Sequence, residues 1–476
     1  MTRAHTAVVV GSGPNGLAAA VHLARNGVRV TVLEARSSVG GGTRTAELTV
    51  PGLLHDICSA VHPFGVASPY LSSLPLAEHG LTWRWPELDL AHPLEDGTAG
   101  VLEGDVTTTS RHLGADGRRW AQVFGPLADS FPTIAGDALG PLLRVPSHPV
   151  RLAQLGLRAA PPASVLARRF RTPQAQALFL GCAAHLFEPL TRPLSAAVGA
   201  MMIAAGHRYG WPVAEGGSES ISRALASLLE SLGGEIVLDT QVRSRADLPD
   251  VDITLFDTTP TAVAEILGAA GTGRGARRKL GAYRSWRYGP AAYKVDLAVR
   301  DGIPWTAEAA RRAGTVHVGG AAENIIASEK ATSVGRMPER PFLLIAQQYL
   351  ADPTRSVGDV HPVWAYAHVP HAYAGDATET VIAEIERYAP GFRERIVAQH
   401  VTTPAGFEAY NANYVGGDIG GGANSVPQLV GRPTLSFDPY YTGIPGMYLC
   451  SASTPPGAGV HGMSGYHAAR SALRRL

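Results

Sequence analysis

The chain has 476 residues, of which 45% are hydrophobic and 17% are charged, and its formal net charge is +1. This balance is typical of a globular protein long enough for two domains, and a charge so near zero excludes electrostatic binding of nucleic acid. Because the sequence has neither an apolar run long enough to span a bilayer nor a charged leader with an apolar core, we expect no transmembrane helix and a cytoplasmic location.

The first motif along the chain is strand, glycine turn, helix, strand and acid. An apolar strand predicted at 8–10 leads into Gly11, Gly13 and Gly16, and a helical pattern and a second apolar strand then end at Glu34. This is the dinucleotide-binding fingerprint. Gly11 permits the tight turn, Gly13 lets a diphosphate approach the backbone, and Gly16 lets the helix pack close to the strand. The helix N-terminus offers N–H donors to the phosphates, while Glu34 can bind ribose hydroxyls and would repel the 2′-phosphate of NADP.

A second glycine cluster follows Glu34, at 40–42, and Thr43 and Arg44 come directly after it. The main-chain N–H groups of such a cluster can line the far half of a long cofactor. The alternative is a flexible surface loop, which explains the glycines but leaves their position after Glu34 as a coincidence. The glycines by themselves do not distinguish FAD from NAD.

The cysteines lie far apart, at Cys58, Cys182 and Cys450, and form no Cys-X-X-Cys pair. We therefore expect buried free thiols, and neither a structural zinc site nor an adjacent redox dithiol. Since no two histidines and a carboxylate have ligand spacing on one element, the sequence predicts no metal site.

The middle of the chain changes character along its length. Residues 76–204 are rich in proline, leucine and tryptophan and predict short helices, residues 211–258 return to a βαβ pattern, and aromatic-rich strands dominate 276–414. The clearest predicted elements are a helix at 218–231 and strands at 235–238, 253–256, 293–299, 342–345 and 363–369.

The chain ends as it begins, with a strand, a glycine-rich loop and a helix. The predicted strand covers 446–450, the loop 451–465 and the helix 466–473. A helix N-terminus after such a loop can face an anion or a dipole. The simplest packing places both ends of the chain in one discontinuous domain and builds a second domain over it from the middle segments.

In four blocks the chain resembles the phytoene desaturase-like flavoproteins, within the wider group that includes glutathione reductase and the flavin amine oxidases. The blocks are the fingerprint through Glu34, the cluster at 40–44, the segment 215–236 and the loop at 449–465, and their order and spacing agree over nearly the whole length. The nearest branch is that of the pyridine nucleotide-disulfide oxidoreductase domain-containing proteins, although this chain has no dithiol.

The resemblance implies a non-covalent, extended FAD and an oxidoreductase of the desaturase or dehydrogenase type. Backbone N–H groups of 460–463 would lie near the N1/O2 edge of the flavin and stabilise its reduced, negatively charged form. The residues implied to bind the cofactor are Gly11, Gly13, Pro14, Asn15, Gly16, Glu34, Ala35, Arg36, Gly41, Gly42, Thr43, Arg44, Val242, Ser451, Val460, His461, Gly462 and Met463.

The expected fold is α/β, with a discontinuous Rossmann-type FAD-binding domain and an interleaved α+β substrate domain. The FAD-binding domain is predicted to comprise 1–75, 205–275 and 415–476, and the substrate domain 76–204 and 276–414.

Two positions depart from the family pattern. Ser451-Ala452 stand where the wider group often has Gly-Asp or Gly-Glu, so the usual acid for the ribityl chain is missing and a nearby hydroxyl or a water would have to replace it. Thr43 displaces the arginine of the common Gly-Gly-Arg, which leaves the individual role of Arg44 open.

Three side chains are candidates for a catalytic role. Lys294 is one of three lysines and lies in an aromatic strand; flavin amine oxidases place a lysine near N5 through a water, and the alternative is a lysine that snorkels from a strand edge. His461 would lie near the flavin edge, either as a base or as a packing residue. His62 would face the flavin ring or serve as a satisfied loop histidine.

Three functions remain open. The first is an FAD oxidoreductase that desaturates, isomerises or aromatises a small apolar, polyene- or isoprenoid-like substrate in an aromatic-lined pocket. The second is an amine or imino-acid oxidase, for which Lys294 is the best indication, and the third is a non-catalytic scaffold with structural FAD.

Residues 151–171 could make peripheral contact with a membrane, and the alternative is a helix face exposed to solvent. The oligomeric state stays open. The aromatic candidates for the pocket are Trp83, Trp85, Trp286, Tyr288, Tyr293, Trp364, Tyr366, Tyr410 and Tyr414.

Overall fold

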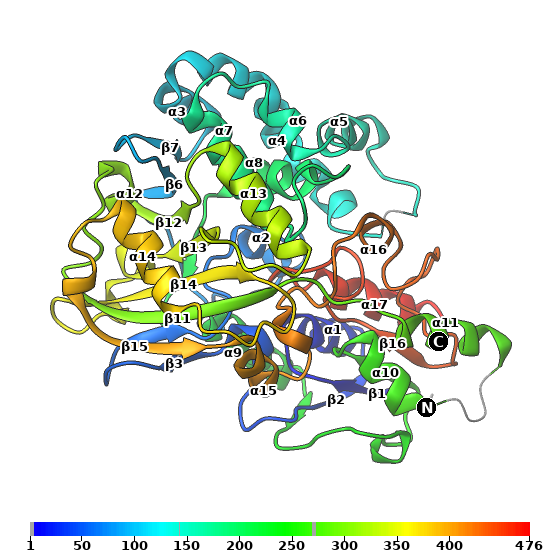
Figure 1. The fold of residues 1–476 in the computed structure, drawn as a ribbon. Coiled ribbons are helices and arrows are strands. Elements are labelled where there is room, and N and C mark those ends of the chain that lie inside the picture. Colours follow the sequence, from blue (N-terminus) through cyan, green and yellow to red (C-terminus); the bar gives the residue numbers. More distant parts are fainter. Residues whose placement is uncertain (1–3, 142, 269–272) are drawn as a thin grey trace.

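The computed structural model describes residues 4–141, 143–268 and 273–476, and two large β-sheets organise them (Figure 1). The first is a five-stranded sheet whose strands all pair in parallel, in the order β16-β10-β1-β2-β9. Its strands are β1 (Thr6–Val10), β2 (Arg29–Leu33), β9 (Glu235–Val237), β10 (Ile253–Phe256) and β16 (Met447–Leu449).

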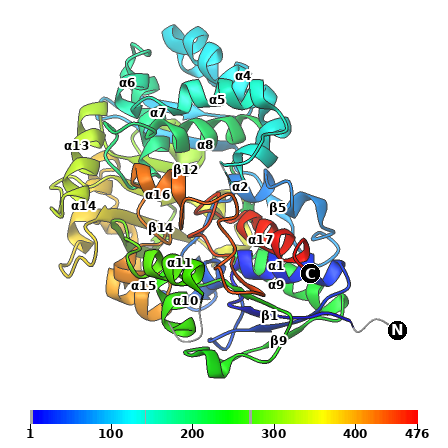
Figure 2. The ribbon, with the colours of Figure 1, turned by 90° about the vertical axis from the view of Figure 1, so that its right-hand side faces the viewer.

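The central strand β1 is buried on both faces, as a parallel sheet between helical layers requires. Ala7 and Val9 belong to the apolar cluster formed with α1 (Pro14–Arg25), α9 (Glu219–Ser231) and α17 (Met463–Leu473). Val8 and Val10 belong to the cluster on the opposite face, which α10 (Pro260–Leu267) and α11 (Arg274–Arg284) cover. Helices α1 and α17 lie side by side, so the two ends of the chain share one layer (Figure 2).

The second sheet has seven strands in the order β15-β11-β14-β13-β12-β6-β7, and all its pairs are antiparallel except that of β12 with β6. One face packs on α12 (Glu308–Arg312) and α14 (Thr378–Tyr388). The strands are β6 (Leu88–Pro93), β7 (Ala99–Leu102), β11 (Ala291–Arg300), β12 (Ala313–Val318), β13 (Leu343–Ala346), β14 (Val360–Val369) and β15 (Ile396–Thr402).

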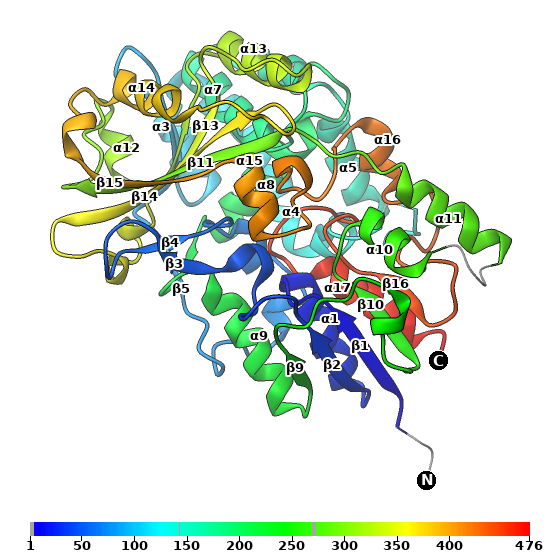
Figure 3. The ribbon, with the colours of Figure 1, turned by 60° about the horizontal axis from the view of Figure 1, so that its bottom comes forward.

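The other face of the seven-stranded sheet contributes to a large apolar cluster with four helices: α4 (Gly117–Ala138), α7 (Pro173–Ala184), α8 (Ala196–Tyr209) and α13 (Ala322–Ser333). Figure 3 shows the five-stranded sheet below the seven-stranded one, with α15 (Pro404–Tyr410) between them. The remaining elements are β3 (Thr45–Glu47), β4 (Leu54–Asp56), α2 (Pro63–Val66), β5 (Trp83–Arg84), α3 (Val106–His112), α5 (Pro149–Ala159), α6 (Ala163–Ala167), β8 (Val213–Ala214), α15 (Pro404–Tyr410) and α16 (Val426–Gly431).

The predicted α/β class with a Rossmann-type parallel sheet is confirmed. The strand predicted at 253–256 is β10, with the same bounds, and the helix predicted at 218–231 is α9, which begins one residue later. The last helix begins at Met463, before the predicted start at 466, because Gly462 adopts the left-handed conformation (φ 65°) that turns the loop into the helix. The division into domains at 75, 204, 275 and 414 stays a prediction. No helix in the described ranges is both long and apolar enough to cross a membrane.

Candidate functional site

A cavity of about 630 Å³ runs from the carboxyl ends of the five-stranded sheet to one face of the seven-stranded sheet. Its first end is lined by the turn after β1 (10–15), the end of β2 (33–36), the glycine cluster (41–44) and the loop after β16 (451–453). Its second end is lined by side chains of β12, β13 and β14 together with α8. The carboxyl edge of a parallel sheet is where open α/β folds bind their ligands.

The turn after β1 requires glycine at each fingerprint position. Gly11 has φ +100°, a conformation that L side chains rarely adopt. A Cβ on Gly16 would lie 2.2 Å from the carbonyl oxygen of Gly11, and a Cβ on Gly13 would lie 2.6 Å from Oδ2 of Asp257. The close packing of helix on strand that the sequence predicts is therefore present, and it leaves no room for a methyl group.

Glu34 is buried at the end of β2, and its carboxylate joins the two glycine segments. Oε2 accepts hydrogen bonds from the backbone N–H (2.9 Å) and the hydroxyl of Ser12. Oε1 accepts from the backbone N–H of Arg36 (2.9 Å) and from Nη2 of Arg44 (3.3 Å). The acid thus fixes the shape of the turn and holds Arg44 beside it.

Two tyrosines from the predicted substrate domain cover the glycine cluster. The hydroxyl of Tyr410 donates to the carbonyl of Gly41, and a Cβ on Gly42 would lie 2.2 Å from the Tyr414 hydroxyl. The guanidinium of Arg44 lies 5.5 Å from the centre of the Tyr410 ring and donates to the carbonyl of Ser38 at 2.7 Å. The cluster is a packed part of the cavity wall rather than a free surface loop.

The second end of the cavity rests on side chains that strand register places on one face. Thr315, Ala346 and Trp364 stand opposite one another across β12, β13 and β14, and Leu344 and Tyr366 form the next row. All five line the cavity. Directly opposed residues in antiparallel strands project to the same face, so this floor follows from the pairing.

The predicted aromatic residues divide between the cavity and other places. Trp364, Tyr366, Tyr410 and Tyr414 line the cavity. Tyr293 packs on the opposite face of the seven-stranded sheet and donates its hydroxyl to Asp376. Trp85 is 49% exposed. Trp83, Trp286 and Tyr288 are absent from the described lining.

Lys294 is completely buried and does not lie at a strand edge, because β11 pairs with β14 on one side and β15 on the other. Its ammonium group forms an ion pair with Asp296 and lies 5.9 Å from the centre of the Trp364 ring. Oδ1 of Asp296 is 3.4 Å from Nδ1 of His55. Lys294 is not among the described residues that line the cavity; it lies beside one of them, Trp364.

His461 is buried in the C-terminal loop, and its Nδ1 accepts a hydrogen bond from the backbone N–H of Met463 at 3.0 Å. Burial lowers the pKa of His461 to about 4, so the imidazole is neutral. Gly459 and Val460 line the cavity, whereas the described lining does not include His461. Through this hydrogen bond the imidazole holds the first turn of α17, and its role as a base or as a packing residue stays a prediction.

His62 does line the cavity, and its hydrogen bonds determine which nitrogen carries the proton. The Ser218 hydroxyl donates to the carbonyl of Ser59 at 2.7 Å, so it must accept at 2.8 Å from Nε2–H of His62. Nδ1, 3.5 Å from the Ser59 hydroxyl, is then the acceptor nitrogen. Burial lowers the pKa of His62 to about 4, which makes the neutral form the resting state.

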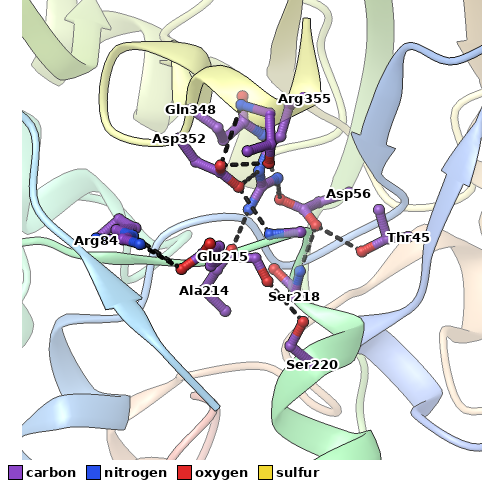
Figure 4. Close-up of polar contacts among 12 residues, drawn as sticks. Thr45, Asp56, Arg84, Ala214, Glu215, Ser218, Ser220, Gln348, Asp352 and Arg355 are labelled. Carbon is purple, nitrogen blue, oxygen red and sulfur yellow. Dashed lines mark hydrogen bonds and ion pairs between the residues drawn. The ribbon is translucent and has the colours of Figure 1, made fainter. Parts of the chain in front are cut away.

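Ser218, the hydrogen-bond partner of His62, also contacts a buried ion network that the sequence did not predict. Figure 4 shows this network. Arg355 pairs with Asp56 and, at 3.1 Å, with Asp352, and it donates to the carbonyl of Ala214 at 2.6 Å. Asp56 also accepts from the backbone N–H of Ser218 at 2.7 Å. Burial raises the pKa of Asp56, but the charge of Arg355 and the hydrogen bond from Ser218 outweigh it and hold that pKa below its usual value. Partners 299 residues apart leave no local signal in the sequence.

Asp257 is a second residue that the sequence reasoning missed. It follows β10 directly, and Oδ2 accepts from the backbone N–H of Gly16 at 2.9 Å. Burial raises the pKa of Asp257 to about 7. A signal was present, because an acid at the carboxyl end of a buried strand lies at the ligand-binding edge of a parallel sheet.

The cavity brings together most of the predicted cofactor-binding residues. Gly16, His461, Gly462 and Met463 are not in its described lining, and Gly16 packs behind the turn. Those that line it are Gly11, Gly13, Pro14, Asn15, Glu34, Ala35, Arg36, Gly41, Gly42, Thr43, Arg44, Val242, Ser451 and Val460.

Fold and site together define a Rossmann-type fold, and residues 9–74 match the family model described as NAD(P)-binding Rossmann-like domain. The chain is 26% identical to pyridine nucleotide-disulfide oxidoreductase domain-containing protein 2 of Rattus norvegicus, over 99% of this chain and 94% of that protein. It is also 26% identical to the hydroxyneurosporene desaturase of Cereibacter sphaeroides, over 98% and 97% of the two chains. The predicted resemblance to desaturase-like proteins and to this branch is confirmed.

The solved structure of a putrescine oxidase variant has the same fold. It is 19% identical in sequence, covers 99% of both chains and superposes with a TM-score of 0.62. The name of the rat relative refers to a disulfide, but this chain has no disulfide among its described residues. Cys58, Cys182 and Cys450 are all buried and free.

Proposed function

We propose that this chain is an FAD-dependent oxidoreductase that acts on carbon–carbon bonds of an apolar, unsaturated substrate. The observation that carries the proposal is the cavity with two chemically different ends, one built from glycine turns and one from an aromatic and aliphatic sheet face. Desaturation is the favoured net reaction, and isomerisation or aromatisation would use the same arrangement. The relative named hydroxyneurosporene desaturase supports this choice.

The residues present fit an extended dinucleotide. Methyl groups at Gly13, Gly16 or Gly42 would collide with neighbouring atoms of the glycine turns or of the cavity wall. Glu34 lies at the end of β2, where the ribose-binding acid of this fold is found. We propose that 1–75, 205–275 and 415–476 form the cofactor-binding domain and that the remainder forms the substrate domain.

Bound FAD would supply the hydride acceptor, and the protein would orient the substrate and exclude water. Trp364, Tyr366 and Leu344 offer an apolar wall that suits a conjugated chain. His62 is uncharged at neutral pH, so this part of the wall does not oppose an apolar ligand, and its Nδ1 can accept a hydrogen bond or a proton. Lys294, paired with Asp296 beside Trp364, positions that ring.

An amine or imino-acid oxidase is the second candidate, favoured by the fold shared with putrescine oxidase and by a buried lysine beside the cavity wall. A scaffold with structural FAD is the weakest candidate, because the cavity continues from the glycine turns to the second sheet.

The test begins with the full-length protein purified without added cofactor. We expect a yellow protein whose released flavin has the mass of FAD. Anaerobic mixing with a panel of polyenes and isoprenoids should bleach the flavin absorbance, and aerobic mixing with a panel of amines should release no peroxide. Peroxide from an amine would favour the second candidate. A colourless protein that cannot be reconstituted with FAD would overturn the first two.

A further inference from the structure

A carboxyl group of the chain itself occupies the N-terminus of α1. Oδ2 of Asp257 accepts from the backbone N–H of Gly16 at 2.9 Å and lies 2.6 Å from the position that a Cβ on Gly13 would take. Asp257 also lines the cavity. The N–H groups at this helix end are those that a dinucleotide fold offers to a diphosphate. Any diphosphate bound at the turn would therefore lie close to this carboxyl.

The groups that face Asp257 offer it no compensating cation. From β2 comes Glu34, whose charge is shared with Arg44 at 3.3 Å and raises the pKa of Asp257 further. From the end of β16 comes Cys450, a thiol that burial keeps neutral by raising its pKa well above the ordinary value. Asn413 donates its amide only to the backbone carbonyl of Asp257, at 3.3 Å. Among the described side chains, no lysine, arginine or histidine forms an ion pair with Asp257.

We propose that Asp257 is protonated in the cofactor-loaded protein, so that binding of a diphosphate dinucleotide takes up one proton from solvent at this carboxyl wherever the pH is high enough to ionise it in the absence of the dinucleotide. The inference rests on the proposed function, because it assumes a dinucleotide at the turn. The physical reason is charge: a buried carboxylate beside a diphosphate would repel it at short range in a medium of low dielectric. The neutral acid removes this repulsion and still accepts the hydrogen bond from Gly16.

The expected pH dependence follows from linkage. Burial already raises the pKa of Asp257 to about 7 in the cofactor-free protein, and a neighbouring diphosphate raises it further. Below that pH the carboxyl is neutral in both states, and the affinity is constant. Above it, binding must recruit a proton, so the dissociation constant should rise by about tenfold per pH unit.

The experiment measures the release of FAD from the full-length, FAD-loaded protein on dilution between pH 6 and pH 9, by recovery of flavin fluorescence. We expect log Kd to be flat near pH 6 and to rise with a slope close to one above pH 7.5. Asp257→Asn keeps the size of the side chain and an acceptor for Gly16, and it should abolish the slope and bind FAD about tenfold or more tightly than wild type at pH 8.5. The control is Asp252→Asn, which makes the same change immediately before the start of β10 and should retain the slope.

A flat log Kd for the wild-type protein, or a slope that persists in Asp257→Asn, would overturn the inference and leave the proposed function intact. Failure to bind FAD at any pH would overturn both. If Asp257→Asn does not fold, a flat log Kd for the wild-type protein still overturns the inference, because linkage equates the slope with the number of protons taken up.

Discussion

The two ends of the cavity are built by different means. The end at the glycine turns is built around the backbone of residues 10–44, and the loop after β16 and side chains from distant segments complete it. The end at the seven-stranded sheet is made of side chains from β12, β13 and β14, which the sequence separates and the antiparallel pairing aligns. The first end is therefore intolerant of added atoms, whereas the second determines what fits by the size and shape of its side chains.

The largest expected effect comes from adding one methyl group to the first end. Gly16→Ala places a Cβ 2.2 Å from the carbonyl oxygen of Gly11, and neither backbone can move without displacing α1 from β1. We expect loss of bound flavin and a destabilisation of about 3 kcal/mol or more, measured by flavin content and urea unfolding. Gly125→Ala, in α4, is the control, because the nearest atom there is 4.0 Å away. Flavin retained in Gly16→Ala would contradict the steric argument.

The second effect concerns the buried ion network around Arg355. Arg355→Met leaves Asp56 and Asp352 buried without their cation, which should cost about 3–5 kcal/mol of unfolding free energy. The matched control, also drawn in Figure 4, is Arg84→Met, since Arg84 pairs with Glu215 but is half exposed. That surface pair should contribute about 0–1 kcal/mol. Equal losses in the two variants would show that burial does not govern the strength of this network.

The third effect should separate the two ends. Ala346→Phe fills the floor of the cavity between Thr315 and Trp364 and leaves the glycine turns untouched. We expect flavin content equal to wild type, an overpacking cost of about 1–3 kcal/mol, and a rise of about tenfold or more in the KM of a substrate found in the polyene panel. A variant that lost its flavin would show that the two ends are not independent.

The smallest effect is a pH dependence of stability. Burial lowers the pKa of His62 from 6.5 to about 4, so between these values the unfolded chain binds a proton that the folded chain does not. The contribution of His62 is therefore complete above pH 6.5 and is lost as the pH falls towards 4, at about 1 kcal/mol per unit. Urea unfolding at pH 7, 6 and 5 should show a shallower decline for His62→Gln than for wild type. Equal declines in the two proteins would show that a group other than His62 binds this proton.

The elements that could be predicted from sequence are those with a local physical signature. The apolar strand that runs into a glycine turn predicted β1. The acid at the end of the next strand predicted that Glu34 lies beside this turn. The predicted role of Lys294 was harder to settle, because whether a lysine in a strand is an edge residue depends on which strands pair with it. The ion pair of Lys294 with Asp296 joins residues that are close in sequence. The burial of Lys294 between β14 and β15, however, depends on strand pairing that the sequence does not show.

The amino-acid order alone was enough to predict a glycine turn of the dinucleotide-binding type and a Rossmann-type sheet whose strands come from separate segments of the chain. This was possible because glycine geometry and apolar periodicity act over a few residues. Only the folded chain could bring Asp257 to Gly16, Arg355 to Asp56 and Tyr414 to Gly42, because each contact joins segments hundreds of residues apart. Burial and charge at such contacts depend on everything packed around them. That is why the protonation of Asp257 and of His62 follows from the tertiary structure and from no motif.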